Sequence, residues 1–382
     1  MPDSLAILHC MRAPLGGLLR HVCDLAEGQS AQGHKVGIVC DATPASKHTE
    51  ERLSRLADTL ALGVHRVDIP RLPGPGDWIG VQRTRAVADR VKPDVLHGHG
   101  AKGGAYARLL KRQTGRRGHL PIRAYTPHGG SLHYAAGSPI GMIYMSLERW
   151  LMERSDLLLF ESEYSRNVYE QALGRAPAPM LVVHNGIGRE ELTAVEPAHN
   201  ASDILFIGEL RDLKGVDVLI EAIALCTAAG QRLTATIVGS GPDSDRYKKL
   251  TDDRALSDAI RFTGAMPVRE AFTLGRVATV PSRKESLPYI VLELAAAGIP
   301  MAASDVGGIG EIFGPQKDRL LPAGDAQALA TALAELVAHP IEAQARARRL
   351  KERVADQFSQ DRMVEGVLNA YEQALATAVK PS

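Results

Sequence analysis

The stretch RVATVPSRKESLPYIVLELAAAGIP, residues 276–300, decides the fold class of this chain. It begins with a short apolar run typical of a strand, continues with a polar loop, and ends with a helical pattern that Gly298 closes. Pro288 stands where the helix begins, and proline suits the first turn of a helix. Strand, loop and helix in this order form the repeating unit of a parallel α/β sheet.

The same order repeats along the chain. Strand patterns alternate with helical patterns from SLAILHC at residues 4–10 to PMLVVHNGI at residues 179–187. After a polar linker, the alternation starts again with DILFIGEL at residues 203–210 and continues to RLLPAG at residues 319–324. Two such series of similar size predict two doubly wound, Rossmann-like α/β domains that face each other across a cleft.

The domain boundaries follow from this change of pattern. Residues 1–188 make the first domain and residues 189–358 the second, and residues 359–382 form a C-terminal helix that we expect to pack back toward the first domain. In open parallel sheets, ligands bind beyond the carboxyl ends of the strands. Functional residues are therefore expected in the loops that follow the strands.

The composition excludes several classes of protein. Of 382 residues, 45% are hydrophobic and 23% charged, which is typical of a globular domain and not of a disordered chain. No run of 18 apolar residues and no signal-peptide pattern occurs, so we expect a cytoplasmic protein. The four cysteines lie far apart in the sequence and match neither a zinc site nor a disulfide framework.

The charge is unevenly distributed. Residues 1–185 contain 23 Lys and Arg against 17 Asp and Glu, whereas the remainder is acidic. Much of the basic excess lies in KRQTGRRGHLPIR, residues 111–123, which is either a solvated loop or a peripheral contact with the inner membrane surface. Nucleic acid is not an expected partner, because aromatic residues are only 4% of the chain and do not interleave with a basic stripe.

Two carboxylates in the deciding stretch are candidates for ligand contact. Glu285 lies in the loop, and Glu293 follows eight residues later on the helix. The N-terminus of a helix above a parallel sheet suits a diphosphate, and carboxylates accept hydrogen bonds from sugar hydroxyls. The alternative is that Glu285 is an exposed loop charge and Glu293 a helix-surface residue.

The N-terminal half offers further candidates. Gly16 and Gly17 follow the first strand and open the first helix, where they allow a phosphate or an acceptor to approach the backbone. The glycine spacing of a dinucleotide site is absent. His128 in TPHGG and His99 in HGHG lie at the ends of strands, where an imidazole either binds a sugar hydroxyl or serves a structural purpose.

Together these segments resemble glycosyltransferase family 4. ESLPYIVLELAAAGIP, residues 285–300, is similar to the family's motif of two glutamates separated by seven residues. FIGELRDLKGVDVLIEAI at residues 206–223, TATIVGSGPD at 234–243 and SDVGGIGEIF at 304–313 match in the expected order. The resemblance covers nearly the whole chain, and it implies the GT-B fold, a nucleotide-sugar donor held mainly by the C-terminal domain, and retention of anomeric configuration.

The resemblance also implies a role for each matching residue. Arg211 and Lys214 bind the donor diphosphate, Glu293 the ribose and Glu285 the sugar. Four residues are assigned to catalysis, namely Glu285, His128, Arg211 and Lys214. The donor contacts, beyond those four, are Gly16, Gly17, Gly239, Gly241, Met266, Ser286, Leu287, Pro288 and Glu293. His99 and Lys102 are assigned to the acceptor side.

The implied reaction is transfer of a hexosyl group to a hydroxyl of a glycan or lipid-linked acceptor. The form ESLPYIVLE is similar to bacterial enzymes of exopolysaccharide, capsule or lipopolysaccharide synthesis. We expect no cofactor and no metal, since Arg211 and Lys214 meet the phosphate charge and the Asp243-Ser244-Asp245 triplet lies at the start of a helix. Two alternatives stay open: a nucleotide-sugar 2-epimerase, and a catalytically idle nucleotide-sugar-binding protein.

Overall fold

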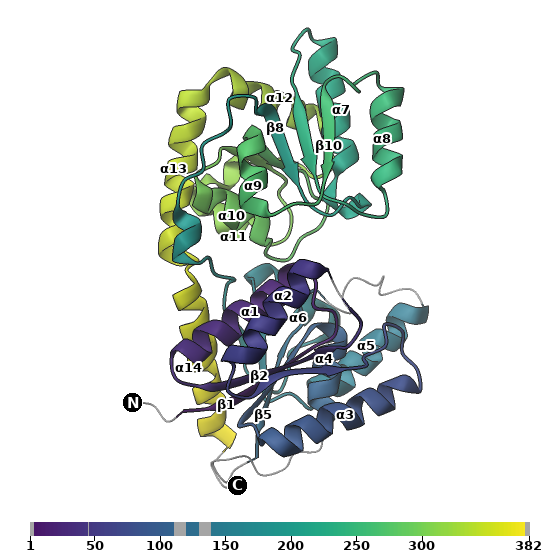
Figure 1. Cartoon of the computed structure of the whole chain (residues 1–382), viewed down its shortest axis with the longest axis vertical. Helices are drawn as coiled ribbons and strands as arrows, with labels where there is room; N and C mark the ends of the chain where they lie inside the picture. Colours follow the sequence, from purple (N-terminus) through teal and green to yellow (C-terminus); the bar gives the residue numbers. More distant parts are fainter. Residues whose placement is uncertain (1–3, 45, 111–119, 130–138, 379–382) are drawn as a thin grey trace. The chain divides into compact units, whose positions relative to one another are not determined.

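The computed structural model describes residues 4–44, 46–110, 120–129 and 139–378, which form two compact units (Figure 1). The N-terminal unit runs to Asn185 and also includes the chain from Gln360 onward. The C-terminal unit runs from Gly186 to Ser359. The basic residues 111–119 and the loop residues 130–138 lie outside the described residues.

The N-terminal unit is built on a parallel sheet. Within the described residues its strand order is β3-β2-β1-β4-β5-β6-β7. The strands are β1 (Ala6–Met11), β2 (Lys35–Asp41), β3 (Gly63–Val67), β4 (Val95–His99), β5 (Ile122–Thr126), β6 (Leu157–Phe160) and β7 (Met180–Val182). The helices are α1 (Gly16–Ala31), α2 (Lys47–Thr59), α3 (Gly76–Val91), α4 (Gly100–Leu109), α5 (Pro139–Met152), α6 (Glu163–Leu173) and α14 (Gln360–Ala378).

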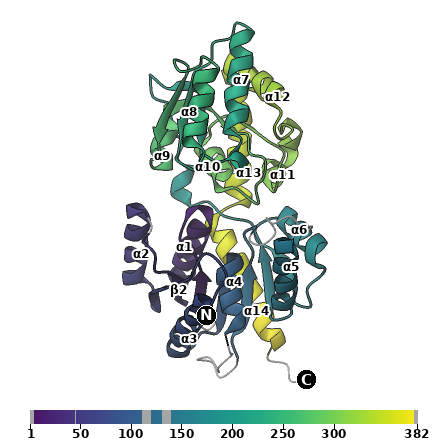
Figure 2. The ribbon, with the colours of Figure 1, turned by 90° about the vertical axis from the view of Figure 1, so that its right-hand side faces the viewer.

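Apolar side chains cover both faces of this sheet. Ile7 of β1, with Leu5 just before the strand, packs in the core cluster that includes residues of α14, whereas Ala6 and Leu8 pack in the cluster that includes residues of α3 and α4. Successive side chains of a strand point to opposite faces, so this fully buried strand needs helices on both sides. Figure 2 shows α5 lying beside α6 in this unit.

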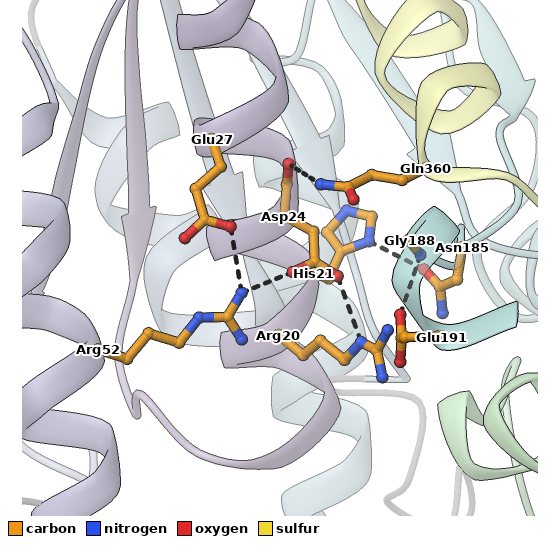
Figure 3. A network of polar contacts seen from close by, with 9 residues as sticks. All are labelled: Arg20, His21, Asp24, Glu27, Arg52, Asn185, Gly188, Glu191 and Gln360. Atoms are coloured by element: carbon orange, nitrogen blue, oxygen red, sulfur yellow. Dashed lines mark hydrogen bonds and ion pairs between the residues drawn. The ribbon is translucent and has the colours of Figure 1, made fainter. Parts of the chain in front are cut away.

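The helix α14 is tied to α1 by polar contacts (Figure 3). The side-chain amide of Gln360 donates to the carbonyl of Asp24 over 3.0 Å. The Asp24 carboxylate in turn accepts hydrogen bonds from Arg20 at 3.2 Å and Arg52 at 2.6 Å. The Gln360 bond thus joins the first turn of α14 to the middle of α1, while Arg52 joins α2 to the same residue, Asp24.

The C-terminal unit is a smaller parallel sheet of order β10-β9-β8-β11-β12 within the described residues. Its strands are β8 (Ser202–Ile207), β9 (Ala235–Val238), β10 (Ile260–Gly264), β11 (Gly275–Val280) and β12 (Met301–Ala303). Its helices are α7 (Val216–Ala228), α8 (Ser244–Asp253), α9 (Val268–Ala271), α10 (Tyr289–Ala297), α11 (Ile309–Phe313), α12 (Ala326–Ala338) and α13 (Pro340–Gln357). Helices α7 and α12 pack side by side (Figures 1 and 2).

Local signals explain where several helices begin and end. The side chains of Ser162 and Asp325 accept hydrogen bonds from backbone N–H groups in the first turns of α6 and α12. Gly298 ends α10 with a φ of 74°, a left-handed conformation that glycine adopts without strain. The predicted stop of that helix is therefore confirmed.

One local prediction was wrong, and one strand was missed. RLLPAG, residues 319–324, forms a single bridge from Leu321 to Ser304 and no strand, because Pro322 has no N–H to extend the pairing. The edge strand β3 was not predicted, since its residues GVHRV are half-buried and partly polar. No helix among the described residues is long and apolar enough to cross a membrane.

Candidate functional site

Two loops at the carboxyl edge of the C-terminal sheet are locked together. They follow β8 and β11, which are neighbours in the sheet. The N–H of Arg283 donates to the carbonyl of Leu213 over 2.8 Å, and the Arg283 guanidinium binds both carboxylate oxygens of Asp217 at 2.8 and 2.6 Å. Gly215, with a φ of 67°, leaves no room for a side chain, because a Cβ there would lie 2.0 Å from the carbonyl oxygen of Pro281.

This locking places Lys214 against Glu285. The Lys214 Nζ donates to Oε1 of Glu285 over 2.6 Å, and the Ser282 hydroxyl donates to the same oxygen over 2.7 Å. The Lys214 side chain is 27% exposed and that of Glu285 is 9% exposed. The cation therefore keeps access to solvent while the carboxylate is held in one orientation.

Arg211 lies on the same loop but outside this contact. Its guanidinium is about half exposed and pairs with Glu209 over 3.4 Å. Arg211 precedes a short 3₁₀ turn, Asp212–Lys214, which carries Lys214 toward Glu285. The structure thus joins Lys214 and Glu285, whereas the described contact of Arg211 is with another residue of its own loop.

Gly239 and Gly241 follow β9 and pack against the loop after β8. A Cβ on Gly239 would lie 1.9 Å from the carbonyl oxygen of Gly208, and one on Gly241 would lie 2.3 Å from that of Leu210. Both glycines are thus needed for packing between neighbouring loops. Met266, after β10, is half-buried and packs against the apolar cluster that contains Leu287.

The start of α10 forms the floor of this edge. Pro288 is the N-cap residue of α10, and the Leu287 side chain is 3% exposed and belongs to the core. The carbonyl of Ser286 accepts a hydrogen bond from the N–H of Gly308 over 2.6 Å. Glu293 lies in the second turn of α10 and is half-buried. The positive end of this helix dipole points into the loop that carries Glu285.

In the N-terminal unit, five histidines gather at the carboxyl ends of β1, β4 and β5. His9 on β1 lies opposite His97 on the neighbouring strand β4, and His99 follows two residues later on the same face. His128 follows β5 and has a φ of 49°, which is rare for a residue with a side chain. His21 on α1 packs edge-on against His128, with ring centroids 4.7 Å apart.

Hydrogen bonds link these rings into a chain. His9 Nε2 contacts the Gln29 Oε1 at 2.9 Å, His9 Nδ1 contacts His99 Nε2 at 2.9 Å, and His99 Nδ1 contacts His128 Nε2 at 3.2 Å. His97 bonds to the hydroxyls of Tyr371 at 2.6 Å and Thr126 at 2.9 Å.

Burial keeps the cluster uncharged. It lowers the pKa of His9 and of His21 to about 4, and it lowers the pKa of His97, His99 and His128 well below 6.5. Neutral imidazoles donate one hydrogen bond and accept another near pH 7. Two triplets bring nitrogen atoms within 4.8 Å of one another, His9 with His97 and His99, and His21 with His99 and His128, which is close enough to hold a metal ion.

A cavity of about 730 Å³ opens beside this cluster. Helices α3, α4 and α5 supply most of its walls, and His99 and His128 line it together with Arg12. Lys102 also lines it, but its ammonium group is paired with Asp77 at 2.5 Å, and the Tyr106 hydroxyl donates to the same carboxylate oxygen over 2.8 Å. The structure therefore brings the predicted His99, His128 and Lys102 to one cavity.

Gly16 and Gly17 open α1, as predicted, and both are exposed. Gly16 has a φ of 57°, and a Cβ there would meet no atom within 4 Å. The need for glycine at this position thus comes from the backbone conformation. The N-cap residue, Leu15, makes no side-chain hydrogen bond to the first turn of α1.

Both units match models of known protein families. Residues 15–191 match the model of the family described as Glycosyltransferase Family 4, and residues 189–355 match that of Glycosyl transferases group 1. The chain belongs to glycosyltransferase family 4. A glycogen synthase of Mycobacterium tuberculosis is 26% identical, over 94% of this chain and 91% of that protein. The putative glycosyltransferase EpsD of Bacillus subtilis is 28% identical, over 80% of this chain and 83% of that protein.

Solved structures of similar architecture identify the fold of this family member as GT-B. The sucrose-phosphate synthase of Thermosynechococcus elongatus superposes with a TM-score of 0.79 at 20% identity, over 97% of this chain and all of that chain. Anabaena HepE, solved in complex with UDP and glucose, gives 0.78 at 18% identity, over 96% and 99% of the two chains.

The sequence of this glycosyltransferase did not indicate three members of the histidine cluster. His9 and His97 lie in apolar strand patterns and His21 in a helical pattern, so none of them has a local signal of its own. The spacing of His97 and His99 by two residues was an available signal, because it places both rings on one face of a strand. The partner of that face, His9, emerges only from the strand register.

Proposed function

We propose that this protein is a retaining glycosyltransferase that moves a hexosyl group from a nucleoside diphosphate sugar to a hydroxyl of a glycan or lipid-linked acceptor. The contact between Lys214 and Glu285, at 2.6 Å, carries the proposal. It combines a partly exposed cation for a diphosphate with a fixed carboxylate for sugar hydroxyls, at the edge of the sheet where ligands of parallel sheets bind. The solved complex of HepE with UDP-glucose supports a donor of this class.

In this mechanism Lys214 and Arg211 bind the donor diphosphate. Cleavage of the bond between the anomeric carbon and the phosphate oxygen leaves negative charge on the diphosphate, and cations close to that oxygen stabilise it. The positive end of α10, at Ser286, Leu287 and Pro288, adds to this field. Glu285 holds hydroxyls of the transferred sugar, and Glu293 holds the ribose.

Bond formation takes place on the face that the diphosphate leaves. The acceptor oxygen forms its bond to the anomeric carbon on that face, and its proton passes to an oxygen of the departing diphosphate. Configuration is thereby retained without an enzyme nucleophile. The neutral ring of His128 orients a hydroxyl through its Nδ1, since its lowered pKa keeps it uncharged near pH 7. His99 uses both ring nitrogens in contacts with His9 and His128, so its role in this mechanism is to position the His128 ring.

A thermal-shift screen tests donor binding. We expect one of the UDP-, GDP-, ADP- and dTDP-sugars to raise the melting temperature of the full chain, because a ligand that binds only the folded state stabilises it. The Lys214→Ala variant should lose this shift. Lys249→Ala is the matched control, because Lys249 is an exposed cation of the same unit that pairs with Asp253 on α8. If Lys214→Ala kept the full shift and full turnover, the assignment of Lys214 would be wrong.

Product analysis tests the reaction. With donor and acceptor, we expect nucleoside diphosphate release, a drop in kcat of about 10²-fold for Lys214→Ala, and a product of the donor's anomeric configuration in NMR. A nucleotide sugar epimerised without acceptor would point to a 2-epimerase, and donor binding without any turnover would point to an idle binding protein. A place in surface polysaccharide synthesis is part of the proposal, because the lipopolysaccharide outer core galactosyltransferase WaaB and WaaG, a glycosyltransferase of lipopolysaccharide biosynthesis, share this fold.

A further inference from the structure

The cavity of the N-terminal unit is mainly apolar. Its volume of about 730 Å³ is within the range of ligand pockets. The apolar and aromatic side chains that line it are Leu18, Trp78, Val81, Leu109, Tyr144, Leu147 and Leu151. They come from α1, α3, α4 and α5, so the cavity is formed between several helices.

Apolar side chains also continue outside the cavity. Trp78 is 69% exposed, Leu147 44% and Leu109 41%, and all three line the opening. Leu72 and Ile143, 75% and 68% exposed, extend this surface, because Leu72 lies between two lining residues and Ile143 precedes Leu147 by one helical turn. Single exposed apolar residues need no explanation, but an apolar surface that surrounds an apolar cavity marks a binding site.

Two cations of the cavity have no anionic partner in the described residues. Lys102 is paired with Asp77, and Glu148 is paired with Arg108 at 2.7 Å. Arg12 and Arg71 line the same cavity, and neither makes an ion pair within the described part of the chain. The cavity therefore carries an excess of positive charge next to its apolar walls.

We propose that this cavity binds the acceptor, and that the acceptor is a lipid phosphate whose hydrocarbon chain lies between α3, α4 and α5. Its phosphate meets Arg12 and Arg71, and the acceptor hydroxyl that it carries reaches His128, which lines the cavity beside His99. The assignment rests on the proposed function, since it supplies the acceptor of that reaction. A water-soluble glycan fits less well, because the carboxylates that could bind its hydroxyls are held in ion pairs with Lys102 and Arg108.

The two tryptophans make the site observable. Both lie in the N-terminal unit, Trp78 at the cavity opening and Trp150 beneath the guanidinium of Arg154 at 3.6 Å. The Trp150→Phe variant leaves Trp78 as the single reporter. Titration with farnesyl phosphate should shift the emission of Trp78 to the blue, as water leaves its ring, whereas farnesol should bind at least tenfold more weakly and inorganic phosphate should cause no shift.

Variants in the same background locate the binding. Leu147→Glu should weaken binding of farnesyl phosphate at least tenfold, and Arg71→Gln should weaken farnesyl phosphate but not farnesol. Ile341→Glu is the matched control, since Ile341 is an 82% exposed residue of α13 in the other unit, and it should bind as the parent does. Because Arg71 and Leu147 are exposed, their variants are expected to fold.

Three results would overturn the proposal. These are the absence of a Trp78 response to farnesyl phosphate, equal binding by Leu147→Glu, and a response to phosphatidylglycerol vesicles that farnesyl phosphate does not compete away, which would make the surface a membrane-docking face. The donor thermal shift is measured on the same samples. Loss of donor binding with farnesyl phosphate binding intact would contradict the proposed function alone, and the reverse result would contradict only the lipid acceptor.

Discussion

Replacement of Gly215 by alanine tests whether the locked loops position the reactive groups of the C-terminal unit. Gly215 adopts a φ of 67°, and its Cβ would lie 2.0 Å from the carbonyl oxygen of Pro281. Such contacts do not occur below 3.0 Å, so the loops after β8 and β11 must separate by about 1 Å. Lys214 and Glu285 lie on these two loops, and a separation of that size would break their 2.6 Å hydrogen bond.

Gly215→Ala should lower the free energy of unfolding for two reasons, backbone conformation and crowding, and a substitution at a second glycine separates them. A left-handed conformation costs an alanine about 1–2 kcal/mol, and the crowding at Pro281 adds to it. Gly230→Ala is the matched control, because Gly230 has a φ of 83° in the same unit and no atom lies within 4 Å of its Cβ position. Gly230→Ala should therefore show only the cost of the backbone conformation.

Calorimetry measures the loss of stability in each variant, and steady-state kinetics measures the change in kcat. For a unit of this size, the Gly230→Ala variant should lose about 2–8 °C in Tm, and its kcat should equal that of the parent. Gly215→Ala should lose more stability, and its kcat should fall about 10²-fold, the effect of a 1 Å misplacement in an active site. If both variants lost the same stability and kept the same kcat, the locked loops would not be what positions Lys214.

Three further predictions concern the rest of the molecule. Burial lowers the histidine pKa values below 6.5, so the unfolded chain binds more protons than the folded one below that pH. The N-terminal unit should therefore lose stability as the pH falls from about 6.5 toward 4. Tryptophan fluorescence in urea at pH 7.5 and 5.0 measures this loss, and equal unfolding midpoints at the two pH values would contradict it. Glu148→Ala leaves the fully buried Arg108 without its charge partner and should lower the free energy of unfolding by about 3–5 kcal/mol in the same assay. The double variant Arg108→Met with Glu148→Leu should lose less stability. A Glu148→Ala variant as stable as the parent would show that the ion pair does not stabilise the fold. Turnover should be unchanged by EDTA, since Lys214 and Arg211 are proposed to meet the phosphate charge; a loss that Mg²⁺ or Zn²⁺ restores would contradict this.

The C-terminal unit could be predicted well because its signals are local. The loop after β11, the proline at the start of α10 and the glycine at its end are all read from one continuous stretch. Likewise, a single strand-to-helix connection predicts the glycines at the start of α1. What the sequence could not supply was the pairing of Lys214 with Glu285, because these residues are 71 positions apart and meet only through the order of β8 and β11.

The N-terminal unit was harder to predict because its features combine distant segments. The histidine cluster draws on β1, β4, α1 and the loop after β5, and each histidine by itself resembles an ordinary strand or helix residue. The cavity depends on side chains from α3, α4 and α5, whose apolar residues serve equally well as core in a helical pattern. Only the packing shows which of those side chains stay exposed.

The membership of α14 in the N-terminal unit has a consequence for synthesis of the chain. Val364, Val367 and Tyr371 of α14 complete the apolar core around Ile7, and the Tyr371 hydroxyl bonds to His97. On the ribosome, the whole C-terminal unit therefore emerges and can fold while the N-terminal core still lacks its last helix. A chain released before α14 is made would lack the Tyr371 hydroxyl that bonds to His97, so the histidine cluster is completed only once α14 has been synthesised.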